Sequence, residues 1–300
     1  MKQEILLYNL FKTGAGIKLL AAVFFSWLVF SGCGDTSRSF TINIKGSDTM
    51  VNLCQKWAEA YMKKNRDVRV VVTGGGSGNG ITALINGSAD IACMSRELLK
   101  IEKERADKKG IKFELTKVAY DGVTVAVNSS LNLEELTVSE LKGIFTGVIK
   151  NFSEVGGDDL TINLYGRDNN SGTYRFFKEN ILHGEEFAST TQVLQGTASL
   201  ADAVAQDKRG IVYGGIGYFI NKPGIKIIKI KSGAGAVSKS PVDADHPNYN
   251  DIRSGRYYIS RNLLLVSKSP ESKMIRDFIA FVLSEEGQNV VSKMNYIPLR

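Results

Sequence analysis

The sequence is poor in the side chains that build metal sites and disulfide frameworks. It holds three cysteines and two histidines in 300 residues, and no two cysteines have a C-x-x-C spacing. A structural zinc site needs four Cys or His ligands at short spacings, so we expect no bound metal. Cys54 and Cys93 lie in apolar segments, where small buried side chains are common. Their spacing does not decide whether they form a disulfide.

Long runs of one charge, internal repeats and low-complexity tracts are also lacking. The formal net charge is +7, and lysines occur as isolated pairs such as Lys63 with Lys64 and Lys108 with Lys109. Such pairs are typical of solvated helix faces, so we expect no nucleic-acid partner. The 43% of hydrophobic residues indicates a globular chain. A mildly basic surface suits an anionic ligand without selecting one.

The N-terminal segment has the pattern of a secretion signal. Lys12 and Lys18 precede the apolar run LLAAVFFSWLVF (19–30), which ends in Ser-Gly-Cys. The run is short for a membrane-spanning helix, and a cysteine after Ser-Gly resembles a bacterial lipobox, with Phe30 in place of the usual Leu. We therefore predict a signal peptide over residues 1–32, lipidation of Cys33 and a tether over 33–39. The mature protein is then exported and lipid-anchored to the membrane, at the periplasmic face or the cell surface.

After residue 40, strands and helices alternate, which predicts an α/β fold with a mostly parallel sheet. The first part predicts strands at 40–46, 69–74 and 89–95, and helices at 49–64, 81–86 and 98–109. A long strand at 118–129 leads to a second part, with strands at 160–166 and 210–219 and helices at 137–145, 173–181 and 199–206. After a polar loop (231–250) come a strand at 256–266 and two helices at 270–283 and 286–294.

The long strands near residues 120 and 260 flank a middle block, as two chain crossings between two lobes would. We predict that lobe I consists of residues 40–119 and 267–300, and lobe II of residues 120–266.

A glycine-rich turn, GGGSGNG (74–80), separates a predicted strand from a predicted helix. Consecutive glycines let the backbone approach a ligand closely, and the free N–H groups of the following helix favour negative charge. The turn is not a Walker loop, because Ile81 and Thr82 follow Gly80 where Lys and Ser or Thr are required. It is not a dinucleotide fingerprint either, since no acidic residue ends a strand about 20 residues on.

The same kind of junction occurs three times. Gly46-Ser47-Asp48-Thr49 and the segment GRDNNSGT (166–173) also connect a predicted strand to a predicted helix through small hydroxyl residues. Each junction alone is compatible with ordinary helix capping. Together, with the guanidinium of Arg167, they predict a cleft that binds a small tetrahedral oxyanion.

Here the chain resembles the PstS-type phosphate-binding proteins of bacterial ABC importers. The motifs that carry the resemblance are KGSDTM (45–50), GGGSGNGITALINGSADIACMSR (74–96), LTVSELKGIFTGVIKNFSEVGG (136–157), YGRDNNSGTYRFF (165–177) and YYISRNLLLV (257–266). The resemblance implies the two-lobed type II periplasmic binding protein fold and phosphate as ligand. It implies as partners the permease and ATPase of an importer, and we expect a monomer. The implied phosphate-binding residues are Ser47, Asp48, Thr49, Ser77, Arg167, Ser171, Gly172 and Thr173.

The chain departs from that family in ways that bear on selectivity. Several members end the third strand with an aspartate that accepts a hydrogen bond from protonated phosphate, whereas Ser95 and Arg96 stand here. Asp48 occupies a place where Thr is common, and Phe152 replaces a frequent Trp. We include Ser95 and Arg96 among the candidate ligand-binding residues. If Asp48 reaches the ligand, it can supply the missing acceptor and repel sulfate. If Asp48 only caps a helix, sulfate or another oxyanion becomes an alternative ligand.

Two other classes of function remain as alternatives. A phosphoryl-handling enzyme would need a metal cluster or a paired nucleophile and base, and the sequence indicates neither, so we assign no catalytic residue and no cofactor. A surface sensor that binds phosphate without feeding an importer has no distinguishing sequence feature.

Overall fold

The computed structural model describes residues 40–300. The predicted signal peptide, Cys33 and the tether lie outside the described residues. Within residues 40–300, Cys54 and Cys93 are free thiols buried in the core. In the same range, no helix has both the length and the apolar character needed to cross a membrane.

A mixed sheet runs through the described part of the chain in the strand order β2-β1-β3-β13-β4-β8-β6-β7, with β9 paired to β4. Its strands are β1 (Phe40–Gly46), β2 (Val68–Thr73), β3 (Ile91–Met94), β4 (Lys112–Asn128), β6 (Asn163–Gly166), β7 (Gln192–Val193), β8 (Gly210–Gly215), β9 (Ile225–Ile227) and β13 (Ser260–Ser269). β1 runs parallel to β2 and β3, and β6 runs parallel to β7 and β8. The alternation of strands and helices explains these parallel pairs, because each helix returns the chain to the same edge.

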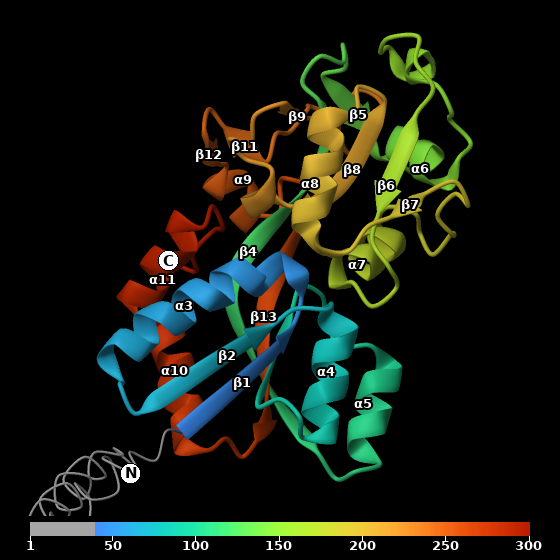
Figure 1. Ribbon diagram of the computed structural model, residues 1–300. Helices are drawn as coiled ribbons and strands as arrows, with labels where there is room; N and C mark the ends of the chain where they lie inside the picture. The colour runs from blue at the N-terminus through green and yellow to red at the C-terminus, as the bar shows by residue number, and fades with distance from the viewer. Residues whose placement is uncertain (1–39) are drawn as a thin grey trace, which may run out of the picture. The chain divides into compact units, whose positions relative to one another are not determined.

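Strands β4 and β13 connect two groups of elements (Figure 1). β4 pairs antiparallel with β13 up to Gly122 and then, from Val123 onward, with β8. β13 also pairs with β3, so the two strands join the β1–β3 group to the β6–β8 group. These are the two crossings that the sequence predicts. The lobe limits at residues 119 and 266 stay a prediction.

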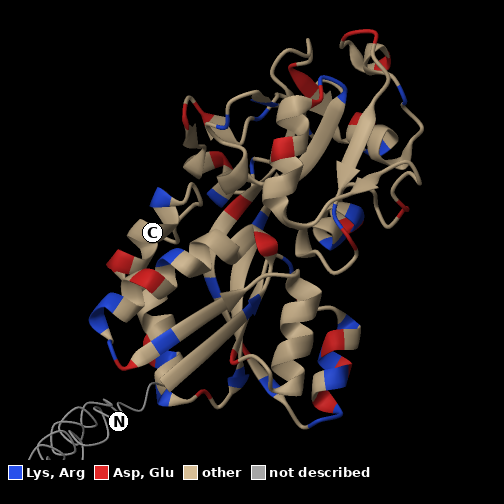
Figure 2. Ribbon diagram, viewed as in Figure 1, with Lys and Arg blue, Asp and Glu red and all other residues tan. Residues whose placement is uncertain are grey.

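In the described part of the chain, the helices that cover the β1–β3 group are α3 (Val51–Lys64), α4 (Ser77–Asn86), α5 (Lys100–Asp107), α10 (Lys273–Leu283) and α11 (Glu285–Lys293). α3, α10 and α11 pack on one another, and α4 packs on α5 (Figure 1). Helix α5 carries charged residues of both signs (Figure 2). The apolar spacing on α3 buries Trp57, whose indole Nε1 donates to the carbonyl of Gly287 at 2.8 Å. This bond ties the N-terminal part of the fold to its last helix.

The second group is built around stacked aromatic rings. The centroids of Phe177 and Tyr213 lie 4.1 Å apart, and Phe145 meets both rings edge-on. Phe152, which replaces a frequent Trp, is fully buried in this core. The helices are α6 (Val138–Thr146), α7 (Gly172–Asn180), α8 (Gly196–Gln206) and α9 (Tyr249–Arg253), and the short strands are β5 (Glu135–Thr137), β10 (Lys229–Lys231), β11 (Val242–Asp243) and β12 (His246–Pro247).

Several element limits differ from those predicted. Helix α4 begins at Ser77, four residues before the predicted start, although glycine is a poor helix former. Gly80 is needed there, because a Cβ would lie 2.4 Å from the carbonyl oxygen of Lys45. β4 begins at Lys112 because β13 supplies it with a longer partner. β8 ends at Gly215, where the 3₁₀ helix η3 (Ile216–Tyr218) starts.

Candidate functional site

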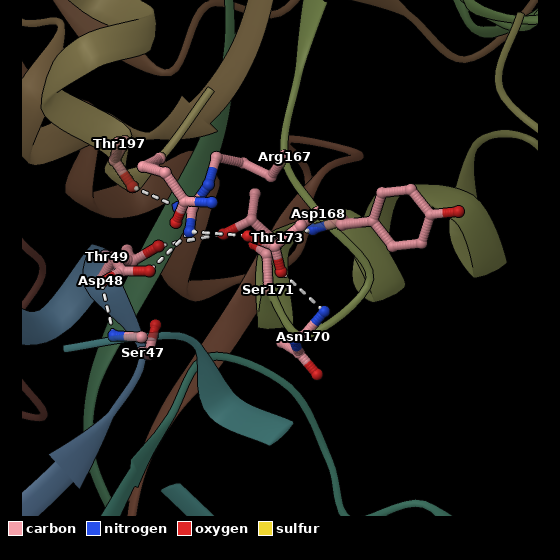
Figure 3. Close-up of polar contacts among 12 residues, drawn as sticks. Ser47, Asp48, Thr49, Arg167, Asp168, Asn170, Ser171, Thr173 and Thr197 are labelled. Atoms are coloured by element: carbon pink, nitrogen blue, oxygen red, sulfur yellow. Dashed lines mark hydrogen bonds and ion pairs between the residues drawn. The ribbon is translucent and has the colours of Figure 1, made fainter. Parts of the chain in front are cut away.

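The three strand-to-helix junctions singled out in the sequence meet at one place. They are β1 to the 3₁₀ helix η1 (Asp48–Met50), β2 to α4, and β6 to α7. Figure 3 shows Ser47, Asp48 and Thr49 from the first junction facing Arg167, Ser171 and Thr173 from the third. The parallel order within each group explains this, since the carboxyl ends of β1 and β2 lie at one edge and β6 reaches it from the other group.

Three serines from the first group are bonded to one another. The Ser47 hydroxyl donates to Ser95 Oγ at 2.8 Å, and the Ser95 amide donates to Ser77 Oγ at 3.2 Å. All three side chains are buried. The junctions that supply Ser47 and Ser77 are therefore joined by Ser95, the residue that follows β3.

Gly172, the first residue of α7, packs directly against this serine cluster. A Cβ at Gly172 would lie 2.2 Å from Ser77 Oγ and 2.6 Å from Ser95 Oγ. Real Cβ atoms do not approach so closely, so only glycine lets the start of α7 reach the serines. Nearby, the Gly78 amide donates to the carbonyl of Asn170 at 3.0 Å. The two groups of elements thus touch through backbone as well as side chains.

Two threonines form a second contact between the groups. The hydroxyls of Thr49 and Thr173 lie 2.9 Å apart, and either can be the donor. Both side chains are buried. Ser171 caps α7, since its Oγ accepts from the Tyr174 amide at 3.2 Å. As an acceptor in that bond, the Ser171 hydroxyl keeps its own hydrogen for another partner.

Asp48 and Arg167 form an ion pair between the two groups. The Asp48 Oδ2 accepts from Arg167 Nη2 at 2.5 Å, and its Oδ1 accepts from the Gly75 amide at 2.8 Å. Asp48 therefore orders the glycine-rich turn and orients the guanidinium, and it does not act as a helix cap. Arg167 also donates to the Thr197 hydroxyl at 3.4 Å, whereas its buried Nε has no partner within residues 40–300.

Two tyrosines hold the backbone of η1 in place. Tyr218 donates to the carbonyl of Asp48 at 2.9 Å, and Tyr296 donates to the carbonyl of Thr49 at 2.6 Å. Burial raises the pKa of Tyr218 to about 12 and raises that of Tyr296 as well. Both phenols therefore stay protonated donors at neutral pH.

Arg96 lies outside the group that the structure brings together. Both Nη atoms of its buried guanidinium bond the carboxylate of Glu102, at 2.7 and 2.8 Å. The positive charge of Arg96 is thereby neutralised within the first group of elements. The other nine candidate residues are those that meet, with Ser95 as the link between Ser47 and Ser77.

Sequence reasoning missed two charged residues beneath the threonines, Arg261 on β13 and Asp121 on β4. Their side chains are 2% and 0% exposed and form an ion pair at 2.7 Å. Each interrupts an apolar strand, in the segments SRNLLLV and AYDGVTV. A lone charge inside an otherwise apolar strand was the available signal, because such a charge needs a buried partner.

Both guanidiniums at the site are paired with carboxylates. Arg261 pairs with Asp121, and Arg167 pairs with Asp48 and also lies 3.9 Å from the carboxylate of Asp168. An anion held here would be met mainly by hydroxyls and by amides at helix starts, whose dipoles favour negative charge. Within residues 40–300, no group of three His, Cys, Asp or Glu side chains is placed to hold a metal ion.

Comparison with known proteins shows the superfamily to which the chain belongs. Residues 32–286 match a PBP superfamily domain, so the chain belongs to that superfamily. A solved phosphate ABC transporter substrate-binding protein from Clostridium perfringens, with bound phosphate, is similar to this chain with a TM-score of 0.75 and 27% identity. The similarity covers 87% of this chain and 100% of the other.

Curated relatives narrow the class to one family. The phosphate-binding protein PstS of Staphylococcus epidermidis is 32% identical over 251 residues, covering 81% of this chain and 74% of the relative. PstS of Pseudomonas aeruginosa is 32% identical over 271 residues, covering 85% and 81%. The chain belongs to the PstS family of phosphate-binding proteins.

Proposed function

We propose that this protein binds inorganic phosphate between its two lobes and delivers it to the permease and ATPase of an ABC importer. The observation that carries the proposal is the convergence of three donor-rich junctions on one buried place. The proposed ligand-binding residues are Ser47, Asp48, Thr49, Ser77, Ser95, Arg167, Ser171, Gly172 and Thr173. The names of the PstS relatives and the phosphate bound in the related structure support the choice of ligand.

Asp48 gives the proposed site its selectivity for phosphate over sulfate. Phosphate keeps a proton near neutral pH, whereas sulfate has none. A carboxylate offers about four lone-pair positions, and Asp48 uses two of them, on Gly75 and Arg167. Each carboxylate oxygen therefore keeps a lone pair that can accept a hydrogen bond from protonated phosphate. For sulfate the same carboxylate is only repulsive.

We further propose that the protein acts as a monomer, anchored to the membrane through a lipid on Cys33. The lobes would correspond to residues 40–119 with 267–300 and to residues 120–266. They would close on phosphate by bending at β4 and β13, which both groups share.

Titration calorimetry with phosphate and sulfate tests the proposal. Phosphate should bind at least about 100-fold more tightly, a difference of about 2.7 kcal/mol. Arg167→Lys should weaken phosphate binding, because a single ammonium cannot replace the guanidinium fork. Arg175→Lys, on the partly buried part of α7, is the matched control. Absence of phosphate binding, or equal affinity for the two anions, would contradict the proposal.

A further inference from the structure

Arg261 lies at the base of the site on one of the two strands that both lobes share. Its Nε and Nη2 donate to the same carboxylate oxygen of Asp121, at 2.9 and 2.7 Å. The other oxygen of Asp121 accepts from the Ile216 amide at 3.1 Å. The Arg261 guanidinium also lies over the ring of Phe176, 5.5 Å from its centroid. The plane of the guanidinium is thus fixed from two sides.

The remaining donors of Arg261 reach both threonines of the site. Nη1 donates to Thr173 Oγ1 at 3.1 Å, and Nη2 approaches Thr49 Oγ1 at 3.4 Å. Thr49 belongs to the first lobe and Thr173 to the second, so one side chain on a shared strand contacts a residue from each.

Counting hydrogens shows what this contact does. Arginine can only donate, so each threonine hydroxyl must accept from it and point its hydrogen elsewhere. One threonine donates its hydrogen to the other across the 2.9 Å contact. The second threonine keeps one O–H directed away from Arg261. The threonine pair therefore keeps one O–H group that can donate a hydrogen bond to an anion.

We infer that Arg261 is a positioning residue for anion binding, which fixes Thr49 and Thr173 as donors and holds them together across the lobes. The inference rests on the proposed function. Asp121 keeps the guanidinium in place and cancels its charge, so Arg261 acts through the threonines and not as a free cation. No sequence motif named above assigns this role to Arg261.

A neutral replacement of the whole pair, Arg261→Gln with Asp121→Asn, tests the inference in the full chain. Replacing both partners avoids the unpaired buried charge that a single replacement leaves. A Gln side chain is too short to reach both threonines while bonding residue 121. The Kd for phosphate, measured by calorimetry, should rise about 10- to 100-fold. An unchanged Kd would overturn the inference while wild-type binding kept the proposed function intact; no binding by the wild type would contradict both.

A second measurement separates positioning from general structural support. The paired replacement is repeated in a Thr173→Val background. If Arg261 acts through the threonines, the replacement should raise Kd there by less than about threefold, because the effects of coupled residues are not additive. A full, additive loss in the Thr173→Val background would overturn the inference.

A conservative variant tests the same inference. Arg261→Lys retains a cation beside Asp121 but lacks the forked guanidinium. Its affinity for phosphate should be as weak as that of the paired variant, and wild-type affinity would overturn the inference.

A stability control uses a residue far from the threonines in the sequence. Phe278→Leu trims a buried ring that packs edge-on against Tyr61. It should lower the melting temperature without changing Kd. A comparable rise in Kd would assign the effect to lost stability and overturn the inference.

Discussion

At the scale of single residues, we expect Asp48 to determine the selectivity between phosphate and sulfate. Its carboxylate bonds the guanidinium of Arg167, from the second group of elements, and the amide of Gly75, from the first. Asp48→Asn removes the anionic acceptor and releases Arg167 from its ion pair. We expect the ratio of phosphate to sulfate affinity to fall by about tenfold or more, about 1.4 kcal/mol. Competition titrations of both anions measure this ratio, and a ratio equal to that of the wild type would show that Asp48 does not discriminate.

A substitution at Gly172 is expected to change phosphate affinity without unfolding the protein. An added Cβ would collide with Ser77 and Ser95, which belong to the first group of elements. Gly172→Ala should therefore hold the lobes apart, raising the Kd for phosphate by about tenfold or more while each lobe keeps its own core.

Gly233→Ala is the control for this change, because nothing lies within 4 Å of the added carbon. Calorimetry and thermal melting should be recorded on both variants. If Gly172→Ala loses stability without losing affinity, the close approach of α7 to the serines is not part of binding.

At the scale of elements, the short helix η1 depends on distant residues for its position. Tyr296, near the C-terminus, donates to the carbonyl of Thr49. Tyr296→Phe leaves that buried carbonyl without this donor, which costs about 1–3 kcal/mol. We expect a lower denaturation midpoint together with weaker phosphate binding. An unchanged midpoint in urea unfolding would mean that water or a small shift of η1 satisfies the carbonyl.

The elements of the site also differ in how far the sequence could predict them. The convergence of the junctions that hold Ser47, Ser77 and Ser171 was predictable, because parallel strands bring their following junctions to a common edge. The direction of the Arg96 side chain was not predictable, since it depends on Glu102 in the first turn of α5. Asp121 and Arg261 are 140 residues apart, and only the register of β4 against β13 pairs them. Helix α4 started early because packing on β1 outweighed the low helix propensity of glycine.

For the whole molecule, buried tyrosines predict the response to alkaline pH. Burial raises the pKa of Tyr213, Tyr218, Tyr257 and Tyr296 in the folded state. A raised folded-state pKa contributes stability that is complete below about pH 10, the value for an exposed tyrosine, and is lost as pH rises above it. Above that pH, each such tyrosine lowers the free energy of unfolding by up to about 1.4 kcal/mol per pH unit.

We therefore expect the free energy of unfolding to fall steeply above pH 10. Ultraviolet absorbance of tyrosinate should report these four groups ionising together with unfolding, while circular dichroism follows the fold. Their ionisation in a still folded protein would contradict the burial on which the prediction depends.

The pairing of both guanidiniums bears on how binding responds to salt. Arg167 and Arg261 are each paired with carboxylate, so no unpaired cation extends its field into the solvent, where such a field reaches about 8 Å at physiological ionic strength. The serine and threonine hydroxyls of the site are buried, and buried interactions are screened much less than exposed ones. Affinity should then change little between dilute and brine-like media. A phosphate-binding protein with such a site would hold its ligand as well in saline surroundings as in fresh ones.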